Sequence, residues 1–150
     1  MTLNNAIHFF EKLVSETPNK SEIKVYEKFL HILNRLKSRT FSEQEMLSIE
    51  AELEFLYLES KPKNRKKHMK KALHEFETYL KDTYSLISKG YYSSLGMALG
   101  STFGLLFGLV VLSHFERNLG VLLGSIFGMV LGMVVGRNLD AKAVAEGRAL

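Results

Sequence analysis

Basic side chains crowd one short stretch of this sequence. The positions are Lys61, Lys63, Arg65, Lys66, Lys67, Lys70 and Lys71. Cations at the start of a helix oppose its macrodipole at a cost of about 0.3–1 kcal/mol each when exposed, so the run does not stabilise the helix that it would begin. We therefore expect these side chains to bind an anion. The candidate anion-binding residues are Lys63, Arg65, Lys66, Lys67, Lys70 and Lys71.

The nearest source of negative charge is the segment that precedes this run. Its acids are Glu43, Glu45, Glu50, Glu52, Glu54 and Glu59. If the two segments are antiparallel helices, their charges lie side by side, and mutual neutralisation is the favoured interpretation. Nucleic acid or nucleotide binding, lipid headgroups and a solvated face are the alternatives. Lipid headgroups are disfavoured because an unbroken helix from Lys71 to Tyr91 spans about 30 Å, beyond the Debye length.

The histidines and acids form no catalytic or metal-binding motif. The five histidines make no His-Glu-x-x-His and no Glu-x-x-His pattern. Glu27 and His31 share one helix face, but a single pair at this spacing is far more often surface than metal site. No phosphate-binding glycine loop sits on a strand-to-helix turn, and the chain has no cysteine. We expect no enzyme activity, no cofactor and no metal site.

Two apolar segments dominate the second half of the chain. Nearly all of the charge precedes Gly90, and the ionisable residues within 91–136 are few. They are His114, Glu116 and Arg117. Roughly 18 apolar residues are needed to cross the hydrocarbon core of a bilayer. Residues 91–112 and 119–136 reach this length, and residues 113–118 between them suffice only for a short loop. The segments are therefore predicted to form a transmembrane helical hairpin.

Basic residues flank the outer ends of the two predicted spans. They are Lys81, Lys89, Arg137, Lys142 and Arg148, against Arg117 alone in the loop. Because cytoplasmic flanks collect Lys and Arg, both termini are predicted to be cytoplasmic in a multi-pass protein of the cell (inner) membrane. Residues 137–150 then form a cytosolic tail. The polar start of the chain has no signal-peptide pattern, so no cleaved leader is expected.

Glycine recurs at every fourth position in both apolar segments. The positions are Gly96, Gly100, Gly104, Gly108, Gly120, Gly124, Gly128, Gly132 and Gly136. An offset of 24 residues, as from Gly96 to Gly120, superimposes the segments, so they form an internal repeat. Residues four apart lie on one helix face, and without Cβ atoms that face becomes a groove in which a second backbone can lie. The pattern predicts close helix packing.

These glycine runs resemble the glycine-zipper two-transmembrane-helix membrane proteins, a loose sequence class that includes channel-forming and self-associating helices. The resemblance covers residues 96–136. It implies close packing of the two helices and, often, a homo-oligomer. The partners that follow are membrane lipid and further copies of this chain.

The first part of the chain, residues 1–89, contains four segments with apolar side chains at helical spacing. The first helix is expected over about residues 2–16, because Pro18 drives the residue before it out of the helical region. The second begins near Ser21. Together with the two helices that follow, these segments predict a small helical bundle with an apolar core.

Capping signals mark the third and fourth helices. The third opens with a capping box of Ser42 and Glu45, and the fourth begins near Pro62. Gly90 then marks either a hinge or a short kink in one long helix, with Ser93 or Ser94 as a cap for the next one. The expected fold is all-α, with an N-terminal cytosolic four-helix bundle followed by a two-helix transmembrane glycine-zipper hairpin.

Two functions fit these elements. In the first, the hairpin self-associates and the cytosolic bundle recruits a protein partner, as an assembly module. In the second, several hairpins form a pore that the bundle gates, and its lining is drawn from a small set of span residues. They are Ser101, Thr102, Phe103, Phe107, Ser125 and Phe127. An enzyme or carrier is disfavoured because neither span holds an ionisable residue.

Overall fold

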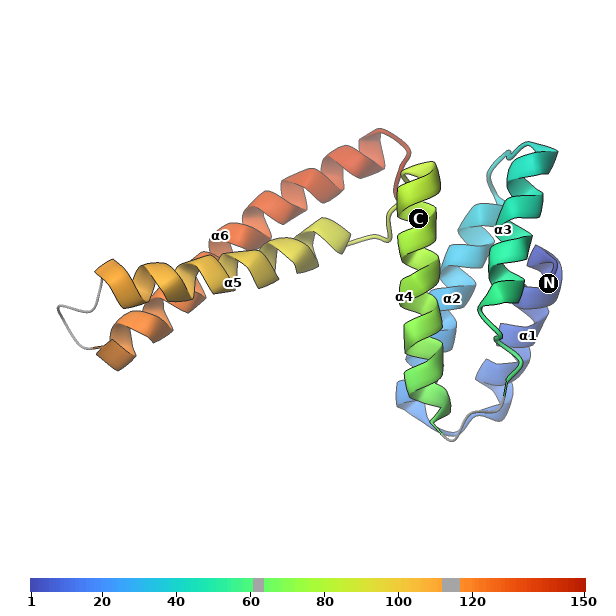
Figure 1. Ribbon diagram of the computed structural model, residues 1–150, viewed down its shortest axis with the longest axis horizontal. Helices are drawn as coiled ribbons and strands as arrows, with labels where there is room; N and C mark the ends of the chain where they lie inside the picture. The colour runs from blue at the N-terminus through green and yellow to red at the C-terminus, as the bar shows by residue number, and fades with distance from the viewer. Residues whose placement is uncertain (61–63, 112–116) are drawn as a thin grey trace. The chain divides into compact units, whose positions relative to one another are not determined.

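The computed structural model describes residues 1–60, 64–111 and 117–150 (Figure 1). Within these residues the chain forms six α-helices, which confirms the all-α prediction. The chain divides into two compact units. The N-terminal unit comprises residues 1–86 together with Leu150, and the second unit comprises Ile87–Ala149.

The N-terminal unit is built from four helices. They are α1 (Leu3–Glu16), α2 (Lys20–Lys37), α3 (Glu43–Phe55) and α4 (Arg65–Tyr84). Each begins where a polar side chain satisfies a free backbone N–H group of the first turn. The caps are Thr2, Asn19, Ser42 and Asn64, and the capping box of Ser42 with Glu45 is present as predicted. Residues 61–63, including the expected start of the fourth helix at Pro62, lie outside the described residues.

Large aromatic side chains fill the core of the N-terminal unit. Phe10 of α1 stacks on Phe29 of α2 with ring centroids 4.4 Å apart, and Phe29 stacks in turn on Phe76 of α4 at 6.3 Å. All three rings are fully buried. α1 packs on α2 and α3, and α2 packs on α4. The removal of this apolar surface from water is what holds the four helices together.

The segment between α4 and α5 is not helical. α4 ends at Tyr84 because Ser85 adopts a left-handed backbone with φ of 55°. Gly90, at φ of 82°, supplies a second positive angle directly before the next helix. The alternative of one long helix with a kink is therefore wrong. Ile87, which has the helical spacing of the α4 core residues, lies beyond the end of α4 and donates its backbone N–H group to the carbonyl of Arg148.

The second unit contains two long antiparallel helices, α5 (Tyr91–Val111) and α6 (Arg117–Ala145) (Figure 1). Both are long and apolar enough to cross a membrane, so the unit is a hairpin of two candidate membrane-spanning helices. Residues 112–116, most of the predicted loop, lie outside the described residues. α6 continues nine residues past Gly136, because no glycine or proline interrupts the predicted tail before Gly147, whose φ of 69° follows the helix end.

Candidate functional site

The contact between α5 and α6 is made of facing glycines. The pairs are Gly96 with Gly132, Gly100 with Gly128, Gly104 with Gly124, and Gly108 with Gly120. A Cβ atom added to Gly104 would lie 2.9 Å from the Cα of Gly128, closer than real Cβ atoms approach a backbone. The remaining glycine of the predicted set, Gly136, lies against Tyr92 and Ser93. The structure thus brings all nine glycines into one interface within the hairpin.

The glycine contacts are symmetric under exchange of the two helices. Gly100 faces the backbones of Gly128 and Gly132, and its equivalent in the repeat, Gly124, faces those of Gly104 and Gly108. Each of these partners is again shifted by the 24 residues of the repeat. The hairpin is therefore an inverted repeat, in which two helices with the same glycine spacing pack against each other through equivalent backbone surfaces.

The predicted pore-lining residues separate into two groups. Ser101 and Ser125 lie in the helix contact, with their hydroxyl oxygens 3.0 Å apart, and the hydroxyl of Thr102 donates to the carbonyl of Ala98 in its own helix. The three aromatic rings lie on the outside of the hairpin. Phe103, Phe107 and Phe127 are 68%, 59% and 66% exposed. Within one hairpin the polar and aromatic candidates therefore do not line a common surface.

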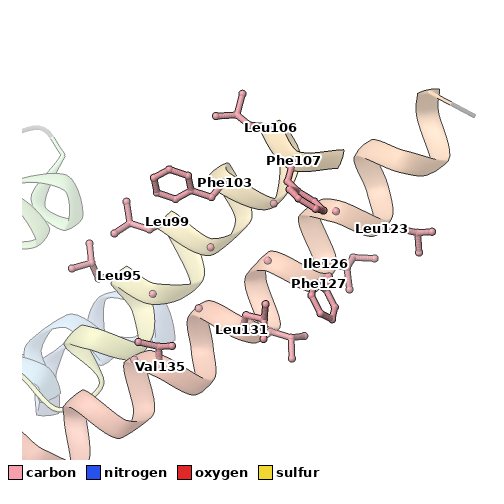
Figure 2. Close-up of a pocket in the computed structure, with 18 of the residues that line it drawn as sticks. Leu95, Leu99, Phe103, Leu106, Phe107, Leu123, Ile126, Phe127, Leu131 and Val135 are labelled. Carbon is pink, nitrogen blue, oxygen red and sulfur yellow. The ribbon is translucent and has the colours of Figure 1, made fainter. Parts of the chain in front are cut away.

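A wide apolar groove runs along the hairpin, with the glycine backbones as its floor. Its walls come from both helices, among them Leu99, Phe103, Phe127 and Leu131 (Figure 2). Figure 2 shows labelled leucine and phenylalanine side chains extending from both ribbons. With a volume of about 1240 Å³ the groove exceeds the usual size of a small-molecule pocket. It suits an extended apolar partner such as a helix.

Asp140, near the end of α6, caps the start of α5. Its carboxylate accepts hydrogen bonds from the backbone N–H groups of Tyr92 and Ser93, both at 3.0 Å, and from the Ser93 hydroxyl at 2.6 Å. The sequence prediction placed the cap at Ser93 or Ser94, and Ser93 is instead a donor. One feature of the sequence indicated a distant cap. Gly90, directly before α5, has no side chain to accept the first N–H groups of the helix, so another residue has to accept them.

Among the described residues, no acid of α3 forms an ion pair with the basic run. Glu50 accepts the backbone N–H group of Leu3 at 2.9 Å, and Glu54 forms an ion pair with the amino group of Met1 at 3.2 Å. These carboxylates therefore serve the start of α1, on which α3 packs. Glu45 closes its own capping box, and the hydrogen bonds from Ser42 lower the pKa of the Glu45 carboxyl below its ordinary value.

The basic run itself lies at the start of α4. Lys66 is half-buried, whereas Lys67, Lys70 and Lys71 are exposed. Lys71 forms an ion pair with Glu75 at 3.3 Å, and in the described part of the chain no acid pairs with Lys66, Lys67 or Lys70. The Nε atom of Arg65 is buried without a hydrogen-bond partner. Lys63 lies outside the described residues. The run therefore keeps most of its charge available for an external anion.

No family model, no curated protein and no solved structure matches the chain. The geometry of the hairpin and of the basic surface carries the functional argument. Glu27 and His31 are both exposed on α2. Within residues 1–60, 64–111 and 117–150, His, Cys, Asp and Glu form no group of three or more that could hold a metal ion.

Proposed function

We propose that this chain is a small integral membrane protein that self-associates and presents its N-terminal helical unit on the cytoplasmic side as an assembly or recruitment module. The observation that carries the proposal is the pairing of two long apolar helices through glycines, which leaves their leucine and phenylalanine side chains on the outside of the hairpin. In lipid there is no hydrophobic drive for helices to associate, so close backbone packing has to supply the attraction. An interface made largely of glycine backbone suits that environment.

The composition of the two helices supports membrane insertion. By sequence, no Asp, Glu, Lys, Arg or His occurs between Tyr91 and Val110 or between Leu119 and Gly136. Asp140, the first acid after the second stretch, is hydrogen-bonded to the start of α5. The rings of Tyr91 and Tyr92 lie at the same end, where aromatic side chains mark the headgroup region. The basic flanks described above assign this end to the cytoplasm.

Self-association uses the outer apolar face rather than the glycines. Each row of glycines is already packed on the backbone of the other helix, so a second copy reaches the hairpin through the apolar groove beside this contact. The groove walled by Leu99, Phe103, Phe127 and Leu131 is a concave apolar surface of the hairpin. A helix of a second hairpin fits its apolar character. The glycines then fold each hairpin, and the aromatic and leucine side chains join hairpins.

A pore is the weaker of the two functions. A conducting lumen needs polar or backbone lining, or a hydrophobic constriction that opens. Ser101 and Ser125 bond to each other inside the hairpin, and the outer face is phenylalanine and leucine. A pore built from these hairpins would be closed by its own apolar wall until the hairpin itself rearranged.

The mass of the purified full-length chain in detergent, measured by light scattering, tests the proposal. We expect a defined homo-oligomer, and Phe127→Ala with Leu131→Ala should shift it to monomer. Leu105→Ile, a change of shape at constant volume on α5, is the matched control. A monomeric parent chain would exclude self-association. Protease cleavage within the N-terminal unit from outside intact cells would reverse the assigned orientation.

A further inference from the structure

Two exposed aromatic residues at the end of α3 lie beside the start of α4, which carries exposed lysines. We call this region the Lys–aromatic surface and define it by Phe55, Tyr57, Lys67, Lys70 and Lys71. The rings of Phe55 and Tyr57 have centroids 6.1 Å apart. The carbonyl of Tyr57 lies 3.3 Å from Nε2 of His68, so the aromatic pair sits beside the turn of α4 that carries the lysines. The surface therefore joins the end of α3 to the start of α4.

The two aromatic side chains contribute little to the stability of the unit. Phe55 is 70% exposed and Tyr57 is 69% exposed, in contrast to the buried rings of the core. Tyr57 also holds a left-handed backbone with φ of 47°, which disfavours a side chain of this kind and suits glycine or asparagine. An exposed tyrosine at a strained position points to a contact outside the unit.

The positive charge of the lysines at the start of α4 is mostly not balanced by nearby acids. From Asn64 to His74 the chain has no acid, and only Lys71 is paired, with Glu75 of the following turn. The positive end of the α4 macrodipole lies among these side chains and adds to their potential. The surface therefore fits an anionic partner that can also contact the two aromatic rings.

A membrane leaflet meets both requirements better than a nucleic acid. Lysines beside exposed aromatic rings are typical of segments that bind anionic headgroups at the bilayer surface. α4 ends at Tyr84, so the unbroken helix beyond Lys71 spans about 20 Å rather than about 30 Å, and the non-helical residues after it free α4 from the direction of α5. Only the six residues from Ser85 to Gly90 join the two helices, so a membrane-anchored unit faces a leaflet at high effective concentration.

We propose that the Lys–aromatic surface binds the anionic lipid headgroups of the leaflet in which the hairpin is anchored. Lys67, Lys70 and Lys71 pair with lipid phosphate and carboxylate groups, and Phe55 and Tyr57 insert between the headgroups. The inference rests on the membrane anchoring proposed above. It assigns the anion that the basic run requires and makes the placement of the N-terminal unit depend on lipid charge.

The test uses the full-length chain with one fluorescent reporter. Because the sequence has no cysteine, Glu59→Cys gives a single labelling site next to the surface. The labelled protein is placed in nanodiscs of phosphatidylcholine alone or of phosphatidylcholine with phosphatidylserine. We expect a blue shift of an environment-sensitive dye, and quenching by headgroup nitroxides, only with phosphatidylserine. High salt should abolish both because the contact is electrostatic.

Charge reversal separates binding from folding. Lys67→Glu with Lys70→Glu should abolish the response, since each lysine near a charged leaflet changes surface association by about fivefold. Glutamate at these positions suits the helix start, so the unit should unfold at the same temperature or higher. Lys24→Glu with Lys28→Glu, on exposed positions of α2, applies the same charge change and should leave the response intact.

A second variant removes the aromatic contact without harm to the fold. Tyr57→Asn replaces the ring by a residue that tolerates φ of 47°, so the unit should gain stability while the dye response falls. If the response were equal in the two kinds of nanodisc, or were lost equally in the α2 control, the inference would be overturned. A response to single-stranded RNA in neutral nanodiscs, with none to phosphatidylserine, would assign the surface to nucleic acid instead.

The same preparations distinguish this inference from the proposed function. A chain that stays in nanodiscs at its oligomeric mass, yet shows no response to phosphatidylserine, would retain the anchor and exclude the lipid surface. A chain that does not enter nanodiscs would exclude both.

Discussion

The two units of this protein are packed by opposite means. In the N-terminal unit the core is made of large side chains, with Phe29 between Phe10 and Phe76. In the hairpin the contact is made of glycines, and the large side chains are on the outside. The difference is what the proposed membrane setting of the hairpin predicts. Water drives apolar side chains together, whereas lipid does not, so packing in a membrane improves when side chains are removed.

The largest expected effect is the loss of the hairpin contact when a side chain is added to it. Gly104→Leu places a branched side chain where the backbone of Gly124 lies, so α5 and α6 should separate. Ser101→Cys with Ser125→Cys reports the contact, because the two hydroxyl oxygens are 3.0 Å apart. The intramolecular disulfide should form in the chain that carries only the two cysteine substitutions, and it should not form when Gly104→Leu is added. Leu105→Ile, on the exposed side of α5, should leave it unchanged.

The N-terminal unit should respond in the reverse way, to the removal of a side chain. Phe29→Ala leaves a cavity between two rings and should lower the free energy of unfolding by about 3–5 kcal/mol. Phe55→Ala, at an exposed ring of the same unit, should change it by less than about 0.5 kcal/mol. Thermal unfolding followed by circular dichroism measures both. Similar losses in the two variants would contradict the core assigned here.

A smaller effect is expected at the start of α5. Asp140→Ala removes the acceptor of the Tyr92 and Ser93 N–H groups and should destabilise the base of the hairpin by about 0.5–2 kcal/mol. Hydrogen exchange at these two amides should accelerate, while the disulfide reporter at Ser101 and Ser125 still forms. Asp82→Ala, an exposed carboxylate of α4, is the control. Unchanged exchange at both amides would show that Asp140 is not the cap.

The smallest effect concerns the capping box of α3. Hydrogen bonds from the backbone and hydroxyl of Ser42 lower the pKa of Glu45 in the folded chain. A lowered pKa means that the contribution to stability is present above the ordinary carboxyl pKa and is lost as the pH falls through the folded value. Glu45→Gln should therefore lower the unfolding temperature slightly near neutral pH and not in strong acid. Glu43→Gln, at another acid of the same turn, is the control.

Local patterns in the sequence were enough to predict the elements. The glycine runs, the apolar spans and the capping box of Ser42 with Glu45 each depend on residues a few positions apart, and the all-α fold with a terminal hairpin follows from them. The end of α6 was missed because Arg137 and the residues after it were assigned by charge to a tail. They are compatible with helix, and nothing breaks it before Gly147.

Contacts between distant residues could not be predicted in the same way. Asp140 lies 48 residues from Tyr92, and Glu50 lies 47 residues from Leu3. The acids of α3 and the lysines of α4 were expected to pair because they are near in sequence. Because α3 packs on α1, Glu50 instead accepts the backbone N–H group of Leu3, and Glu54 pairs with the amino group of Met1. Within the described residues, neither carboxylate pairs with a lysine of α4.

The inverted repeat also bears on which helices pair when the hairpin folds. Because α5 and α6 offer equivalent glycine faces, α5 of one copy could pair with α6 of another through the same contacts, in a domain swap. The contacts themselves do not choose between the two pairings. Only five residues separate Val111 from Arg117, and such a short connection keeps the two helices of one copy at far higher local concentration than those of a neighbour. The length of the connection, rather than the glycine surface, therefore makes each chain close on itself.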